Sequence, residues 1–195
     1  MLVFGRNSQN ISLGGIRMAE LKGSQTEKNL LYAFAGECQA RVKYEYFSSK
    51  ARKEGYEQIS AFFDETSRNE KEHAELWFKL LKGIGCTADN LKAAAAGENE
   101  EWTKMYKEFA EVARKEGFTE IAETFEGVGE VERNHEIRYL KLLENVKNGS
   151  VFKKSASTVW ICRNCGHLHT GDAAPDMCPV CQHAKAYFEV HCANY

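Results

Sequence analysis

One long stretch of the chain occurs twice, and this internal repeat constrains the fold more than any other feature of the sequence. AGE at 35–37 returns at 96–98, ARKEGY at 51–56 returns as ARKEGF at 113–118, and KLL at 79–81 returns at 141–143. The offset is 61 residues for the first match and 62 for the others, so the second copy carries one extra residue between Glu98 and Tyr106. The unit that repeats is predicted to be a helical hairpin.

Both copies have the apolar spacing of helices. Leu and Phe residues recur at intervals of three and four, and Gly55 and Gly117 punctuate the two copies. The two prolines of the chain both follow residue 170, so they interrupt none of this pattern. Helices are therefore predicted at 25–53, 56–82, 89–115 and 118–147, packed as a four-helix bundle whose core is formed by the periodic Leu and Phe side chains.

The composition is that of a soluble globular protein. The chain has 195 residues, 43% hydrophobic and 28% charged, and its net charge of −2 gives no electrostatic basis for binding nucleic acid or an anionic membrane. No apolar run reaches the length of about 18 residues that a membrane-spanning helix needs. Four of the seven cysteines lie in CxxC pairs and the others have no evident partner, which predicts a reducing, cytoplasmic location.

Residues 1–17 match nothing downstream and contain two Arg, two Ser and no acidic residue. This composition fits an organelle transit peptide, which would change the predicted location, or a disordered tail. A third hypothesis is that translation starts at Met18. Gly14 and Gly15 can be encoded as GGA GGA a few bases before the Met18 codon, and this sequence would resemble a bacterial ribosome-binding site that has been read as coding sequence. The third hypothesis is preferred, and an intact mass of the natural protein that includes residues 1–17 would refute it.

Each copy carries the same three potential metal ligands. A Glu lies in its first helix, and a Glu-x-x-His pair lies in its second, where residues three apart share a face. A single such pair is most often a solvated surface feature, but two at matching positions are typical of di-iron carboxylate bundles. Oxygen donors with one imidazole per metal favour iron or manganese. The candidate ligands are Glu37, Glu70 and His73 in the first copy and Glu98, Glu132 and His135 in the second.

The repeat is imperfect at one chemically important position. Glu101 lies three residues after Glu98, whereas the first copy has Ala40 there, so two bound metals would have unequal ligands. The five carboxylates of the site would have the same net charge with two ferrous ions as with two ferric ions and an oxo bridge. Electrons could therefore enter together with protons without leaving an uncompensated charge in the core. Tyr44 and Tyr106 lie two turns beyond the first-helix Glu of each copy, and they either hydrogen-bond to the site or fill the core.

After residue 150 the helical pattern gives way to Gly, Pro, aromatic residues and paired cysteines. Two CxxC pairs twelve residues apart are typical of two knuckles that close on one metal ion, and a segment of about 38 residues needs such a metal to fold. The spacing fits zinc as well as iron. The predicted ligands are Cys162, Cys165, Cys178 and Cys181, and the nearby His167, His169, His183 and His191 are expected to be loop residues.

The predicted organisation is a leader at 1–17, a helical domain at 18–149, a linker at 150–157 and a small metal domain at 158–195. In chain order, EKNLLYAFAGECQAR, EKEH, AAGENEEW, ERNH and the paired CxxC knuckles resemble the rubrerythrin family from Met18 to about Val190. The resemblance implies a mainly α protein, with a ferritin-like four-helix bundle that binds two irons and a rubredoxin-like domain that binds one. It also implies a peroxidase that reduces hydrogen peroxide in oxidative stress defence.

The same resemblance implies a role for each ligand. Glu70 and Glu132 would bridge the irons, while Glu37, Glu98 and His135 would be terminal ligands. The less constrained iron would exchange Glu101 for His73 between its ferric and ferrous states. The catalytic residues would then be Glu101, His73, Tyr44 and Tyr106, because the two tyrosines match family tyrosines near the di-iron site. Electrons would come from an external donor such as a rubredoxin or an NAD(P)H-dependent reductase.

The connection between the second and third helices is short for a ferritin-like bundle. Only 25 positions separate His73 from Glu98. At about 1.5 Å per helical residue and about 3.5 Å per extended residue, they barely return the length of the bundle. A homodimer that exchanges hairpins is therefore predicted. Two other functions stay open, a ferroxidase or iron-handling protein built on the same bundle, and a non-catalytic redox carrier with a zinc-filled ribbon.

Overall fold

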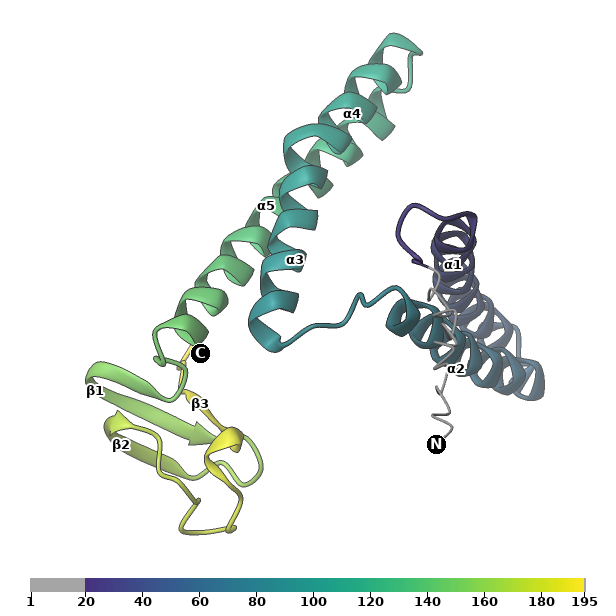
Figure 1. Ribbon diagram of the computed structural model, residues 1–195. Helices are drawn as coiled ribbons and strands as arrows, with labels where there is room; N and C mark the ends of the chain where they lie inside the picture. The colour runs from purple at the N-terminus through teal and green to yellow at the C-terminus, as the bar shows by residue number, and fades with distance from the viewer. Residues whose placement is uncertain (1–19, 195) are drawn as a thin grey trace, which may run out of the picture. The chain divides into compact units, whose positions relative to one another are not determined.

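The computed structural model describes residues 20–194 (Figure 1), so the predicted leader at 1–17 lies outside the described residues. The helices are α1 (Gln25–Lys53), α2 (Glu57–Leu80), α3 (Thr87–Glu100), α4 (Tyr106–Lys115) and α5 (Thr119–Lys147), and a π-helical turn, η1 (Glu101–Met105), joins α3 to α4. Together, α3, η1 and α4 form the third predicted helix. The mainly helical fold is confirmed, and the predicted helix ends agree with the observed ones to within two residues.

The two hairpin turns have the same geometry. Gly55 and Gly117 adopt positive φ values of 86° and 88°, a left-handed conformation that favours glycine after a helix. The next backbone N–H, that of Tyr56 in one turn and Phe118 in the other, donates to a carbonyl of the last helical turn at 2.9 and 2.8 Å. The repeated KEG sequence therefore ends α1 and α4 in the same way and sends the chain back along itself.

The chain divides into two compact units after Ile84, and each unit contains one helical hairpin. In the first unit α1 packs on α2, and in the second α3, η1 and α4 pack on α5. The aromatic contacts inside the hairpins also repeat, because a Tyr and two Phe residues cluster at equivalent positions. These rings are Tyr44, Phe47 and Phe63 in the first hairpin and Tyr106, Phe109 and Phe125 in the second.

The deepest helix contacts differ between the hairpins. Ser48 and Ser60 are 1% and 0% exposed in the first, and their hydroxyl oxygens lie 2.9 Å apart in a hydrogen bond. The equivalent residues of the second hairpin are Ala110 and Ala122, which are 2% and 0% exposed. One hairpin therefore joins its helices through a buried polar pair, whereas the other packs two methyl groups at the same place.

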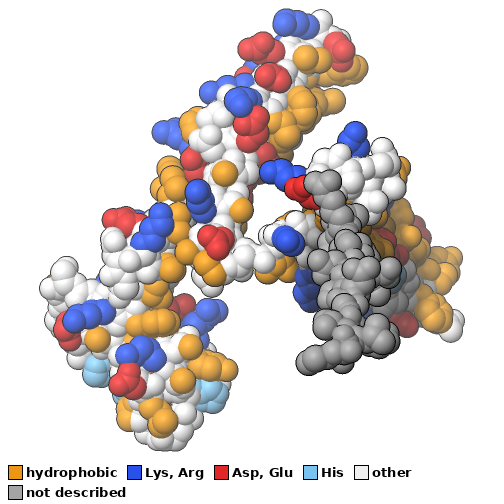
Figure 2. Space-filling model, in the orientation of Figure 1, with side chains coloured by type: hydrophobic (Ala, Val, Ile, Leu, Met, Phe, Trp, Pro, Cys, Tyr) orange, Lys and Arg blue, Asp and Glu red, His pale blue; other side chains and the backbone are white. Residues whose placement is uncertain are grey.

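Many side chains predicted to form the core are exposed on their own hairpin. Leu31, Phe62, Leu76 and Leu80 are all more than half exposed, and Figure 2 shows apolar side chains along the surface of the α4/α5 hairpin as well. Two packed helices bury only the side chains that lie between them. The apolar side chains that would face the other two helices of a four-helix bundle therefore stay exposed on an isolated hairpin. Among the described residues, no helix has the length and apolar character needed to cross a membrane.

The C-terminal module is a small antiparallel sheet in the order β2-β1-β3, formed by β1 (Lys153–Cys162), β2 (Leu168–Ala173) and β3 (Phe188–Val190), with a 3₁₀ turn η2 (Lys185–Tyr187) before β3. Its core contains Trp160 and Phe188 together with Cys162 and Cys178, and Cys181 packs against this cluster. Strand β1 begins inside the segment predicted as a linker at 150–157. The structure differs there because Lys153 pairs with Ala173, a contact that local composition does not reveal.

Candidate metal centres

The first candidate centre lies between α1 and α2. Glu37 comes from the first half of α1, and Glu70 and His73 come from one face of α2. The Nδ1 atom of His73 lies 2.9 Å from Oε2 of Glu70 and 3.9 Å from Oε1 of Glu37. The Glu70 and Glu37 side chains are only 16% and 26% exposed, which is low for carboxylates. Two helices therefore direct three donors toward one point.

The second candidate centre repeats this geometry between α3 and α5. The Nδ1 atom of His135 lies 2.6 Å from Oε2 of Glu132 and 3.8 Å from Oε2 of Glu98. The Glu132 and Glu98 side chains are 14% and 19% exposed. The sequence repeat is thus a repeat of side-chain geometry as well, and each hairpin forms one three-residue group.

Each group fits a hard divalent metal ion. Within a group the three potential donor atoms all lie within 4.8 Å of one another. Donors on opposite sides of an ion bound at about 2.0–2.2 Å would be about 4.4 Å apart. Carboxylate oxygens and imidazole nitrogens suit iron or manganese, and three protein donors leave open coordination positions. Each group is therefore an incomplete site that further ligands have to complete.

The electrostatics of the second group favour binding of a cation. Burial raises the pKa of Glu98, and the adjacent Glu132 raises it further through a shared hydrogen bond and like charge, while His135 lowers it in part. Burial also raises the pKa of the Tyr106 phenol, and the charges of Glu101, Glu132 and Glu98 add to this effect. Carboxylates that repel one another in a half-buried site are relieved by a bound metal ion.

The extra residue of the second copy is accommodated by η1. Its π-helical turn starts at Glu101 and lies within the interval where the repeat offset changes from 61 to 62, and the Tyr106 N–H donates to the Glu101 carbonyl five residues earlier. A residue inserted into a helix is commonly absorbed as such a bulge, often at a functional site. Glu101 lies outside both three-residue groups, but its charge acts on Glu98 and Tyr106.

The two predicted tyrosines both lie in the aromatic clusters of their hairpins. The ring centroid of Tyr44 is 6.1 Å from that of Phe63, and the ring centroid of Tyr106 is 6.1 Å from that of Phe125. Both therefore fill the space between the helices. For Tyr106, the charges of Glu132 and Glu98 of the second group also contribute to the raised pKa of the phenol.

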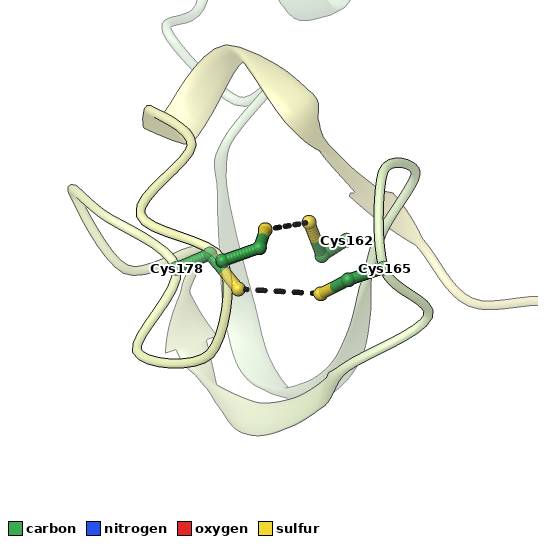
Figure 3. A group of neighbouring side chains, drawn as sticks. Cys162, Cys165 and Cys178 are labelled. Atoms are coloured by element: carbon green, nitrogen blue, oxygen red, sulfur yellow. Dashed lines mark hydrogen bonds between the residues drawn. The ribbon is translucent and has the colours of Figure 1, made fainter.

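The four cysteines of the C-terminal module converge (Figure 3). The Sγ atoms of Cys162 and Cys181 are 3.7 Å apart, as are those of Cys165 and Cys178. Four sulfurs bound tetrahedrally at about 2.3 Å from one ion would be about 3.8 Å apart, so these two separations match those expected around a single metal ion. Thiolate ligation of this kind suits iron and zinc.

Backbone N–H groups at the two knuckles also favour bound thiolates. A hydrogen bond from the His183 backbone lowers the pKa of Cys181 to about 6. The His167 backbone has the same effect on Cys165, but desolvation and the neighbouring sulfurs outweigh it and raise that pKa to about 12. Among the described residues, no histidine joins the four-cysteine group.

The sequence patterns did not reveal a polar network on the outer flank of the second group. The Asn99 amide donates to Oε1 of Glu136 at 2.9 Å, and the Trp102 indole N–H donates to Oε2 of the same carboxylate. The Lys107 ammonium lies 5.2 Å from the centroid of the Trp102 ring. The available signal was the loss of repeat identity at these positions, where the first copy has different residue types.

Two matching carboxylate–imidazole groups on helical hairpins, followed by a four-thiolate module, define a class of non-haem metalloproteins with a ferritin-like and a rubredoxin-like part. The comparisons with known proteins agree with this class. The Rubrerythrin family model matches residues 28–143 and 89–158, and the model for the rubredoxin-like domain of rubrerythrin matches residues 160–189. The chain belongs to the rubrerythrin family.

Individual relatives extend over most of the chain. A rubrerythrin of Porphyromonas gingivalis is 53% identical over 188 residues, which cover 90% of this chain and 94% of that protein. A rubrerythrin of Nitratidesulfovibrio vulgaris is 48% identical and covers 91% of this chain and 100% of its own length. A solved structure of nigerythrin in a mixed-valence state is 27% identical and covers 98% of this chain and 100% of its own, with a TM-score of 0.33 that supports no structural argument.

Proposed function

We propose that the protein is a di-iron peroxidase, which reduces hydrogen peroxide to water with electrons that enter through an iron at the four-cysteine centre. One peroxide, two electrons and two protons give two waters. The observation that carries the proposal is the presence, on one chain, of two matched carboxylate–imidazole groups together with a four-thiolate centre. The first two can hold a pair of metal ions, and the third is a one-electron carrier when it binds iron.

The ligand roles in the proposal are those that the resemblance to the rubrerythrin family implies. In this proposal Glu70 and Glu132, the least exposed carboxylates of the two groups, would hold two irons together with Glu37, Glu98 and His135. Glu101 and His73 would be alternative ligands. His73 is 51% exposed and Glu101 lies in a π-helical turn, so both have room to exchange. Bound iron would supply the electrons that cleave the O–O bond.

The chain's own contribution to orienting peroxide centres on Tyr106. Burial, and then the charges of Glu101, Glu132 and Glu98, raise the pKa of its phenol, which therefore keeps its proton and would donate a hydrogen bond to a peroxide oxygen in the site. Tyr44 occupies the equivalent position of the first hairpin, packed against Phe63. We assign both tyrosines to orienting peroxide oxygens through hydrogen bonds, and nearby carboxylic acids to supplying the protons.

Electrons reach the four-cysteine centre from an external donor, such as a rubredoxin or an NAD(P)H-dependent reductase. The iron-filled form carries one electron at a time, whereas zinc at the same four thiolates would stop the transfer. The reducing, cytoplasmic location inferred from the cysteines suits this role, because the thiols at 162, 165, 178 and 181 have to remain available for metal.

The active form in this proposal is a homodimer with exchanged hairpins. Each hairpin supplies one three-residue group and leaves apolar side chains exposed, including Phe62 on α2 and Ile137 on α5. Covering those stripes with the complementary hairpin of a second copy would bury them and bring two groups together. The di-iron centre would then take ligands from both subunits.

A ferroxidase that handles iron is the alternative, and oxidant choice distinguishes it. We expect the anaerobically reduced, iron-loaded protein to reoxidise faster with hydrogen peroxide than with oxygen, as followed by the visible absorption of the two kinds of iron centre. Faster reaction with oxygen would refute the peroxidase proposal.

Substitution of the extra carboxylate tests the assigned site. Glu101→Ala is expected to slow peroxide turnover by about 10- to 100-fold, while leaving the absorption of the four-cysteine iron unchanged. Lys104→Ala is the matched control, because Lys104 lies in the same π-helical turn but pairs only with the exposed Glu100. Unchanged turnover in the Glu101 variant would remove this residue from the mechanism.

A further inference from the structure

The polar network on the flank of the second group ties together the residues that adjoin the proposed ligands. Asn99 follows Glu98 in the sequence, Trp102 follows Glu101, and Glu136 follows His135. Glu136 accepts a hydrogen bond on each of its carboxylate oxygens, one from the Asn99 amide at 2.9 Å and one from the Trp102 indole. A single carboxylate on α5 therefore fixes two residues of the neighbouring helix.

The indole of Trp102 is held on its ring as well as at its N–H group. The Lys107 ammonium lies 5.2 Å from the ring centroid, and the Arg133 guanidinium carbon lies 5.7 Å from it, both within the range of cation–π attraction. Arg133 follows the proposed ligand Glu132 on α5. The half-buried ring is thus constrained by α5 from two positions and by α4 from one.

This network is absent from the first copy of the repeat. Cys38 stands at the position of Asn99, and Ala74, which is only 7% exposed, stands at the position of Glu136. Neither side chain can make the hydrogen bonds of the second copy. The network therefore occurs in the hairpin that also has the extra residue, the π-helical turn and Glu101.

A π-helical turn needs such support because it interrupts the regular hydrogen bonding of the helix. The Thr103 hydroxyl donates to the Asn99 carbonyl, which adds a side-chain bond between the turn and the end of α3. Without an anchor, the extra residue could be accommodated one position earlier or later along the helix. Accommodation at an earlier position would rotate Glu101 away from the side of the helix that carries Glu98.

We propose that Glu136, through Trp102 and Asn99, fixes the register of the π-helical turn and thereby directs Glu101 toward the second metal group. Glu136 is a positioning residue, since it acts on Glu101 through Trp102. The proposal rests on the proposed function for the metal role of Glu101. Its structural part concerns the turn itself and does not depend on any bound metal.

The first experiment measures amide hydrogen exchange across residues 101–106 in the metal-free full-length protein. Glu136→Gln keeps the size of the side chain, but its amide end cannot accept a hydrogen bond, so one of the two donors is lost. Trp102→Phe keeps an aromatic ring and removes the indole donor. Both variants are expected to exchange about tenfold faster at these residues, with no change in α2, whereas Lys104→Ala should match the parent. Unchanged exchange in both variants would overturn the proposal.

The second experiment is a double-mutant cycle with anaerobic cobalt(II) titration of the full-length protein. Glu136→Gln should weaken binding at the helical centres by about tenfold or more, and should have no further effect in a chain that already carries Glu101→Ala. Equal losses in both backgrounds would show that Glu136 acts on the hairpin in general, which would overturn the positioning role. If the parent protein bound no cobalt at the helical centres, the proposed function would fail, and the exchange experiment would still decide the structural part.

Discussion

Lengthening the connection between α2 and α3 is predicted to convert the proposed exchanged dimer into a monomer. In a closed single-chain bundle, His73 and Glu98 would lie at one level. From His73 the helix continues about 10 Å to its end at Leu80, and from its start at Thr87 the next helix takes about 17 Å to reach Glu98. The connection would therefore have to span about 27 Å. Its seven steps from Leu80 to Thr87 reach at most about 25 Å.

Ten inserted Gly and Ser residues between Ile84 and Gly85 remove this restriction. Seventeen flexible steps have a root-mean-square span of about 23 Å and can extend well beyond 27 Å. A hairpin tethered in this way has an effective concentration of about 1 mM. At about 10 µM protein, closure within one chain is then favoured over exchange by about a hundredfold. The metal content per chain should stay the same.

The assay is molar mass by light scattering during size-exclusion chromatography, together with metal analysis of the same fractions. The parent protein is expected to be a dimer and the lengthened protein a monomer. The same ten residues inserted between Gly149 and Ser150, after α5, provide a control that should remain dimeric, because that insertion leaves the hairpin connection unchanged. The reasoning is refuted if the parent is a monomer with a full complement of helical metal, or if the lengthened protein remains a dimer.

Three further predictions concern single sites. Cys165→Ser should abolish electron delivery from an external reductase, while chemically pre-reduced protein should still complete one peroxide turnover. Stopped-flow absorption measures both reactions. Loss of the single turnover as well as of electron delivery would contradict the role of the four-cysteine centre as an electron carrier. Ser48→Ala should destabilise the protein by about 1–3 kcal/mol in urea unfolding, because it leaves the Ser60 hydroxyl buried without its partner. Changing both serines to Ala should restore most of the lost stability. Additive losses from the two substitutions would contradict the explanation by an unpaired hydroxyl. The pKa of Glu98 is raised above its usual 4.5 in the folded protein, so its contribution to the stability of the metal-free protein is present below about pH 4.5 and is lost as the pH rises through the raised value. Glu98→Gln should remove that part of the pH dependence of thermal unfolding. An unchanged pH profile would contradict the conclusion that burial raises the pKa of Glu98.

The internal repeat and the glycines at its turns were sufficient to predict the helices. Helix formation depends on side chains three and four residues apart, and the hairpin turns depend on Gly55 and Gly117, so both are local properties. The convergence of Cys162 and Cys165 with the second CxxC pair could be predicted for a related reason. Each pair is a local knuckle, and one tetrahedral ion leaves few ways to combine two of them.

Properties that depend on distant partners could not be predicted. Strand β1 begins at Lys153 because that residue pairs with Ala173. The composition of residues 150–157, which were predicted to be a linker, does not reveal this pairing. Leu31 and Phe62 have the spacing of core residues, yet periodicity does not reveal whether the other helix of the hairpin covers them. Each hairpin buries only the stripe between its own helices.

By itself, the sequence determined which residues are helical, which acids and imidazoles recur on one helix face, and where one residue is inserted. The tertiary structure alone decided how that insertion is absorbed. Beside the π-helical turn, the bonds from Asn99 and Trp102 to Glu136 join residues 37 and 34 positions apart, across the contact between two helices. Local spacing fixes the face on which a side chain lies, but only packing against α5 selects the register of a helix that has one residue too many.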